Sequence, residues 1–69
     1  MNGLKKFRRG LGITQAHFAE RIGATQQQVS AWEQGDVSMS IKVLFRISDE
    51  FNCQIKVLPF TDELEIITL

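Results

Sequence analysis

The sequence contains a single cysteine, Cys53, among its 69 residues. One cysteine cannot form a disulfide within its own chain, so we expect a reducing, cytoplasmic setting. No apolar run approaches the roughly 18 residues that are needed to span a bilayer. The basic residues near the start are not followed by the apolar stretch of a secretory signal. The sequence therefore predicts a protein without a membrane partner.

The residue sets from which enzymes and metal sites are built are also missing. The sequence offers no pair of catalytic acids, no nucleophile with a nearby base and no glycine-rich phosphate loop. The only histidine, His17, is far along the chain from Cys53, which is not the spacing of metal ligands. We therefore expect no enzymatic activity, no metal ion and no cofactor.

The charges are balanced in number but not in position. The formal net charge is zero, yet residues 1–46 carry seven basic and three acidic groups, a net charge of +4. Residues 47–69 carry one basic and five acidic groups, a net charge of −4. Such asymmetry is typical of a chain with one basic face and an acidic tail. A basic first half favours a nucleic-acid partner.

Apolar residues recur at helical spacing in four short segments. The positions expected to be buried are Leu4, Phe7 and Leu11, then Phe18, Ala19 and Ile22, then Val29 and Trp32, and finally Ile41, Leu44, Ile47 and Phe51. Thr14, Thr25 and Ser40 are the expected N-caps of the last three helices. Gln28, three residues after Thr25, completes a capping box. Gly10 and Gly12 are expected to end the first helix, with Gly12 as a candidate C′ residue, and the other helices are expected to end at Gly23, Gly35 and Asn52.

The pattern changes after residue 52. Cys53, Ile55 and Val57 alternate with polar residues, which predicts a short strand stopped by Pro59. Residues 64–69 fit either a second strand or a tail. A single strand lacks backbone partners, so it must pair with the tail as a hairpin or with the same strand of a second subunit. The fold class is therefore mainly α: a compact four-helix domain over 1–52, followed by a short strand and tail over 53–69.

Residues 4 to 52 resemble the helix-turn-helix domains of lambdoid phage repressors and of the xenobiotic-response-element-type bacterial regulators. The resemblance rests on the segments 11–15 and 32–35, and on Ala19, Gly23, Val29 and Trp32 at the helix-turn-helix spacing. Ala19 has to be small where two helices cross, and Gly23 supplies a positive φ that other residues resist. The resemblance implies a repressor-like four-helix domain whose third helix enters the major groove of DNA.

The same resemblance assigns the base-reading residues to the start of the third helix. They are Gln26, Gln27 and Gln28, with Ser30 and Ala31 nearby. A glutamine amide can pair bidentately with adenine, and a short alanine can contact a thymine methyl. The alternative is that the glutamines form only a solvated helix start. Gln28 has a competing role, because the capping box can occupy its side chain.

Phosphate contacts are expected beside this helix. The candidates are Thr14 and Gln15 at the start of the second helix, Arg8 or Arg9 in the first, and Lys42 in the fourth. By resemblance, Gln15 also braces the first reading glutamine. The resemblance further pairs Glu33 with Arg8, which makes Glu33 a structural residue. Trp32 is expected in the core.

These features predict a sequence-specific DNA-binding repressor that acts as a homodimer, because one reading helix contacts few base pairs. The short chain with a terminal strand resembles antitoxins that are paired with persistence-type kinase toxins and repress their own operon. In those proteins the strand pairs across the dimer axis, which gives the dimerisation residues as Gln54, Ile55, Lys56, Val57 and Leu58. One alternative is a phage-type repressor or stand-alone regulator without a toxin. Another is a protein-interaction module that has lost DNA binding and uses the tail 60–69.

Overall fold

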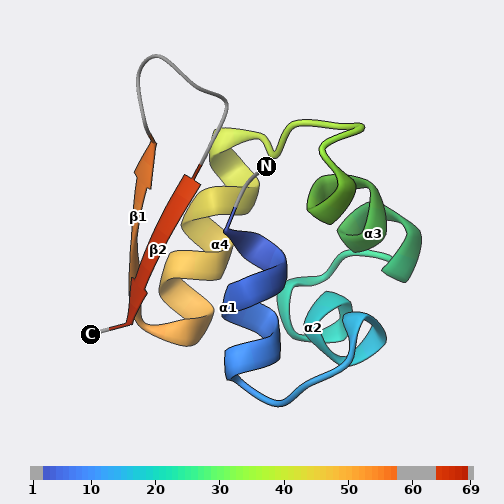
Figure 1. The fold of residues 1–69 in the computed structure, drawn as a ribbon, viewed down its shortest axis with the longest axis horizontal. Coiled ribbons are helices and arrows are strands. Elements are labelled where there is room, and N and C mark those ends of the chain that lie inside the picture. The colour runs from blue at the N-terminus through green and yellow to red at the C-terminus, as the bar shows by residue number, and fades with distance from the viewer. Residues whose placement is uncertain (1–2, 58–63, 69) are drawn as a thin grey trace.

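The computed structural model describes residues 3–57 and 64–68. In order along the chain these residues form four helices and two strands: α1 (Leu4–Gly10), α2 (Gln15–Ile22), α3 (Gln26–Gln34), α4 (Ile41–Phe51), β1 (Cys53–Val57) and β2 (Leu64–Thr68). The two strands lie beside α4 and α1, on the side of the molecule opposite α2 and α3 (Figure 1). None of the helices in these ranges is long and apolar enough to cross a membrane. The mainly α fold with four helices is confirmed.

Hydroxyl side chains set the start of three helices, as predicted. Thr14, Thr25 and Ser40 each accept a hydrogen bond from the backbone N–H three residues later, over 3.1, 3.1 and 3.3 Å. These bonds satisfy N–H groups that the first turn of a helix leaves without a partner. Gly23 ends α2 with a φ of 71°, in the left-handed region that favours glycine. This turn redirects the chain from α2 into α3.

One apolar core connects all of these elements. Its buried residues are Leu4, Phe7, Phe18, Ala19, Ile22, Val29, Trp32, Ile47 and Cys53. Three aromatic rings meet at its centre: Phe18 stacks on Phe51 at 4.9 Å between ring centroids, and Phe7 meets both rings edge-on. Such ring pairs add stabilisation beyond the apolar area that they bury. Trp32 is part of this core, as the sequence predicted.

Two apolar residues expected in the core are on the surface. Leu11 is 40% exposed because α1 already ends at Gly10 and Leu11 follows it as the C-cap. Ile41 is 70% exposed because α4 turns a different row inward. The residues of α4 that pack on the core are Val43, Ile47 and Phe51, spaced four apart. Leu44, also expected in the core, is half-buried and does not belong to this row. The prediction was therefore wrong at Leu11 in the first segment and at Ile41 and Leu44 in the fourth.

The structure shows the hairpin, one of the two pairings that the sequence left open for β1. β1 pairs antiparallel with β2 of the same chain, with Ile55 opposite Ile66 and Lys56 opposite Glu65. Buried Cys53 and half-buried Ile55 and Ile66 pack on the helical core, so the hairpin completes the core. β2 occupies one edge of β1, and the cross-subunit pairing expected from the resemblance is not needed to satisfy that edge. Leu58, one of the predicted dimerisation residues, lies outside the described residues.

Candidate nucleic-acid interface

The packing of α2 against α3 leaves the start of α3 on the surface (Figure 1). Ala19 is buried where the two helices meet, and its carbonyl accepts a 2.9 Å hydrogen bond from Ala24 N–H just after the turn. Val29 and Trp32 hold the inner side of α3 in the core. The opposite side of α3 therefore faces outward at a fixed angle to the domain, as a helix that enters a groove must.

The three glutamines at this exposed start have different roles. Gln26, Gln27 and Gln28 are all exposed. The Gln28 side-chain oxygen accepts a 2.9 Å hydrogen bond from Thr25 N–H, while Gln28 N–H donates to Thr25 Oγ1. A bidentate contact with adenine needs both the oxygen and the nitrogen of an amide. The expected reading role of Gln28 is therefore corrected to that of a cap, and Gln26 and Gln27 project beyond it.

Ser30 and Ala31 lie one turn further along α3. Both are half-buried. Ser30 Oγ accepts a 2.9 Å hydrogen bond from Gln34 Nε2, which leaves the Ser30 hydroxyl hydrogen to donate elsewhere. Gln34 was not singled out from the sequence, although its i+4 spacing from Ser30 allows this contact. The structure thus brings both predicted residues to the edge of the same surface as Gln26 and Gln27.

The start of α2 is the second part of the surface. Thr14 is exposed, and its hydroxyl oxygen accepts from His17 N–H. Gln15 is half-buried and its Nε2 donates to Glu33 Oε1 over 3.1 Å. The expectation that Gln15 braces the first reading glutamine is therefore corrected, because its amide is held by Glu33. The second N–H of that amide remains for an outer acceptor such as a phosphate oxygen.

A buried ion pair lies beneath these residues. Arg8 Nε and Nη2 donate to the two carboxylate oxygens of Glu33 over 2.6 and 3.1 Å, and Arg8 Nη1 donates to the carbonyl of Ile13. Burial alone would raise the pKa of Glu33, but the hydrogen bonds from Arg8 and Gln15 and the charge of Arg8 hold it below its usual value. The hydrogen bond to Glu33 likewise raises the pKa of Arg8. This hydrogen-bond network connects four parts of the chain: α1, the loop that precedes α2, the first residue of α2, and α3.

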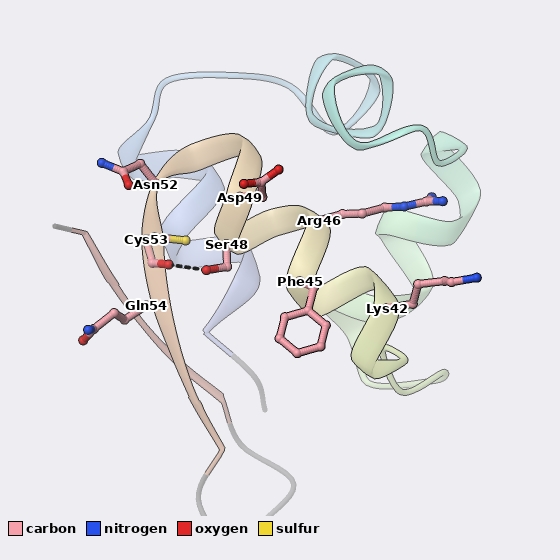
Figure 2. Close-up of a pocket in the computed structure, with 8 residues that line it drawn as sticks. All are labelled: Lys42, Phe45, Arg46, Ser48, Asp49, Asn52, Cys53 and Gln54. Atoms are coloured by element: carbon pink, nitrogen blue, oxygen red, sulfur yellow. Dashed lines mark hydrogen bonds between the residues drawn. The ribbon is translucent and has the colours of Figure 1, made fainter.

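The basic residues expected to contact phosphate separate into two groups. Arg8 is buried with all three of its guanidinium nitrogens engaged, so its predicted phosphate role is corrected to the structural one. Arg9 and Lys42 are exposed. Arg46, which the sequence analysis did not single out, extends from the same side of α4 as Lys42, toward α3 (Figure 2). Its spacing of four residues from Lys42 was the signal that could have identified it.

The pH dependence of stability follows from the lowered pKa of Glu33. Because this pKa is lower in the folded protein than in the unfolded chain, the ionised carboxylate stabilises the fold above the ordinary glutamate pKa of about 4.3. That stabilisation is lost as the pH falls through the lower, folded-state pKa. We expect the melting temperatures of the wild type and Glu33→Gln to differ most near neutral pH and to converge in acid. A difference that stays constant down to about pH 2 would contradict this account.

A metal site and a reactive thiol would be other sources of chemistry in the described part of the chain. No group of three His, Cys, Asp or Glu residues gathers there in a way that could hold a metal ion. Burial raises the pKa of the Cys53 thiol, whose Sγ donates to the carbonyl of Ile47 over 3.7 Å. A buried thiol of raised pKa acts as a small apolar core residue rather than as a nucleophile.

Comparison with known proteins places the chain in a helix-turn-helix family. The profile of the family described as "Helix-turn-helix" matches residues 4–58. A protein of Methanothermobacter thermautotrophicus is 40% identical over 45 residues, which span 65% of this chain and 65% of that protein. A protein of Archaeoglobus fulgidus is 27% identical over 63 residues, 91% of this chain and 90% of that protein. Both are described as uncharacterized HTH-type transcriptional regulators. No solved structure is significantly similar to the chain.

Proposed function

Because this chain belongs to the helix-turn-helix family of DNA-binding transcription regulators, we propose that it is a sequence-specific repressor that binds a two-fold operator as a homodimer. The observation that carries this proposal is the exposed start of α3. There, Gln26 and Gln27 stand next to a Thr25–Gln28 capping box that fixes the first turn of the helix. A rigid helix start with outward amides suits the major groove, where a glutamine can read adenine.

Phosphate contacts would hold this helix in register on the duplex. Thr14 and Gln15 lie at the N-terminus of α2, where unpaired N–H groups and the helix dipole favour an anion. Arg9 and Lys42 add exposed positive charge from α1 and α4. Contacts of this kind position a protein without reading sequence, and they make affinity depend on salt. Base preference is then left to α3.

The protein would repress transcription by occupying a promoter. It would meet that promoter DNA in the cytoplasm. Within this class we favour an antitoxin that represses its own toxin–antitoxin operon, since the chain combines a short reading domain with a terminal hairpin. Residues 54–57 of β1 are the described part of the expected dimerisation element. They can still serve in it, because β2 pairs with only one edge of β1 and the other edge has no strand partner among the described residues. Co-purification with the product of an adjacent reading frame tests the toxin partner; its failure would favour a stand-alone regulator.

Footprinting tests the operator proposal. A selected duplex should show two protected half-sites about one helical turn (~34 Å) apart and related by two-fold symmetry. Binding should weaken steeply as salt is raised, because phosphate contacts release counterions. One asymmetric, unrepeated site would contradict the two-fold repressor. Absence of salt-dependent retention on any duplex would favour the alternative of an interaction module that has lost DNA binding.

Replacing Gln26 or Gln27 with alanine should weaken operator binding by about 1–3 kcal/mol and relax the preference at one base position in each half-site. The reason is that each variant loses one set of amide contacts to a base edge. Binding to a panel of operators with single base changes measures this effect. Gln28→Ala is the matched control, because it should lower stability by roughly 1 kcal/mol through the lost cap and leave base preference intact. Unchanged preference in both Gln26→Ala and Gln27→Ala would show that the reading residues are elsewhere.

A further inference from the structure

The outer side of α4 carries an apolar row that the core does not use. Ile41 is 70% exposed and Phe45 is 67% exposed. They are four residues apart, so they lie on the same side of the helix, one turn from each other. Val43 and Ile47, which point to the core, belong to the other side of α4. Two large apolar side chains exposed side by side on one helix are a candidate interaction surface.

A groove runs beside this row, between α4 and the start of β1. It is lined by Lys42, Phe45, Asp49, Asn52 and Gln54, among others. Figure 2 shows the Phe45 ring on the outer surface of α4, on the side toward β1. β1 pairs with β2 through one edge, and in Figure 2 its other edge lies on the side of α4. At the start of this edge Ser48 Oγ donates to the Cys53 carbonyl over 2.6 Å. Phe45 and a β1 edge that has no strand partner among the described residues therefore border the same groove.

We propose that this groove is the docking site for a second copy of the chain, with the two α4 helices packed antiparallel across a two-fold axis. This inference rests on the homodimer of the proposed function and assigns its interface. The charges of α4 favour that partner. Lys42 lies three residues before Phe45 and Asp49 lies four residues after it, and both line the groove together with Arg46. An antiparallel pair centred near Phe45 brings Lys42 opposite Asp49 of the partner subunit, twice per dimer. In this arrangement Lys42 serves the subunit interface rather than a DNA phosphate.

The arrangement also suits the DNA-binding surface. In both views β1 lies on one flank of α4 and α3 lies on the other (Figures 1 and 2). The two-fold axis of an antiparallel pair runs perpendicular to the plane that contains both helices. Rotation about this axis leaves the β1 flanks of both subunits on one face of that plane and the α3 flanks of both subunits on the other face. Both α3 helices would then face the same side, as one face of a duplex requires. The two unpaired β1 edges would likewise approach each other on the opposite side.

Sedimentation of the full-length chain without DNA tests the interface. Phe45→Glu should raise the dimer dissociation constant on the order of a hundredfold, because both copies lose the aromatic anchor and gain a charge. Val37→Glu is the matched control: Val37 is also exposed and apolar but lies outside the groove, so this variant should associate like the wild type. Circular dichroism establishes that each variant is folded. A Phe45→Glu dimer as tight as the wild type would overturn the proposal, as would a wild type that stays monomeric.

Charge exchange tests the antiparallel geometry. Lys42→Glu and Asp49→Lys should each weaken the homodimer, because like charges then face each other. Mixing the two variants in equal amounts should produce a heterodimer that is at least tenfold tighter than either homodimer, since every facing pair is again of opposite charge. Absence of heterodimer preference would overturn this arrangement. If footprinting still shows two symmetric half-sites in that case, the repressor stands and only the α4 interface is wrong.

Discussion

Replacing Glu33 with glutamine should lower the free energy of unfolding by about 3 kcal/mol and leave base preference nearly unchanged. The side chain of Glu33 is only 2% exposed, and it receives two hydrogen bonds from Arg8 and one from Gln15. Neutralising it leaves the buried Arg8 charge without a counter-charge, which is the costly way to break such a pair. For a domain whose total stability is roughly 3–10 kcal/mol, this loss is large. Chemical denaturation at neutral pH measures it.

The chain provides a matched control for this prediction. Arg21 and Glu50 form a second ion pair at 2.7 Å, but the Glu50 side chain is 39% exposed. Glu50→Gln should cost less than about 1 kcal/mol, because water screens and replaces an exposed pair. The double variant Arg8→Met with Glu33→Leu should recover much of the stability that Glu33→Gln loses, since it removes both buried charges. Equal effects of Glu33→Gln and Glu50→Gln would contradict the buried network.

Leu4→Ala should destabilise the fold by about 2–5 kcal/mol, whereas Leu11→Ala should cost less than about 1 kcal/mol. The same atoms are removed in both variants, and the sequence pattern places both leucines in one helical row. The structure separates them: Leu4 is fully buried in the core and Leu11 is 40% exposed after the end of α1. Removing Leu4 leaves a cavity among packed side chains, and removing Leu11 does not. Thermal unfolding of the two variants decides the point, and equal losses would mean that Leu11 is part of the core.

The local signals in the sequence were sufficient to place the helices. Thr14, Thr25 and Ser40 act as N-caps and Gly23 ends α2, because a hydroxyl oxygen or a left-handed backbone satisfies helix ends in any surroundings. The exposed start of α3 followed from the same reasoning. These features depend on residues within one turn of each other, and the sequence displays them directly.

Features that depend on several elements at once could not be obtained in this way. The apolar pattern of α4 allows more than one inward row, and only packing against α1, α2 and the hairpin selects the row of Val43 over that of Ile41. The pairing of β1 with β2 depends on a segment whose pattern also fits a tail. At the interface, Gln15 has two possible partners, and the position of Glu33 decides between them. In each of these cases, the packing and hydrogen bonds of residues that are distant in the sequence decide between alternatives that the local pattern leaves open.

The central claim is that the start of α3 is the surface that meets DNA. An NMR titration of the full-length chain with the tightest duplex from a random library tests it most directly, by following backbone and glutamine side-chain amides. The largest shifts should fall on Thr14, Gln15 and the segment 25–31, including the side-chain amides of Gln26 and Gln27. The outward-facing residues of β1 and β2 should change little. Unshifted Gln26 and Gln27 amides, with the largest changes on the hairpin instead, would contradict the account.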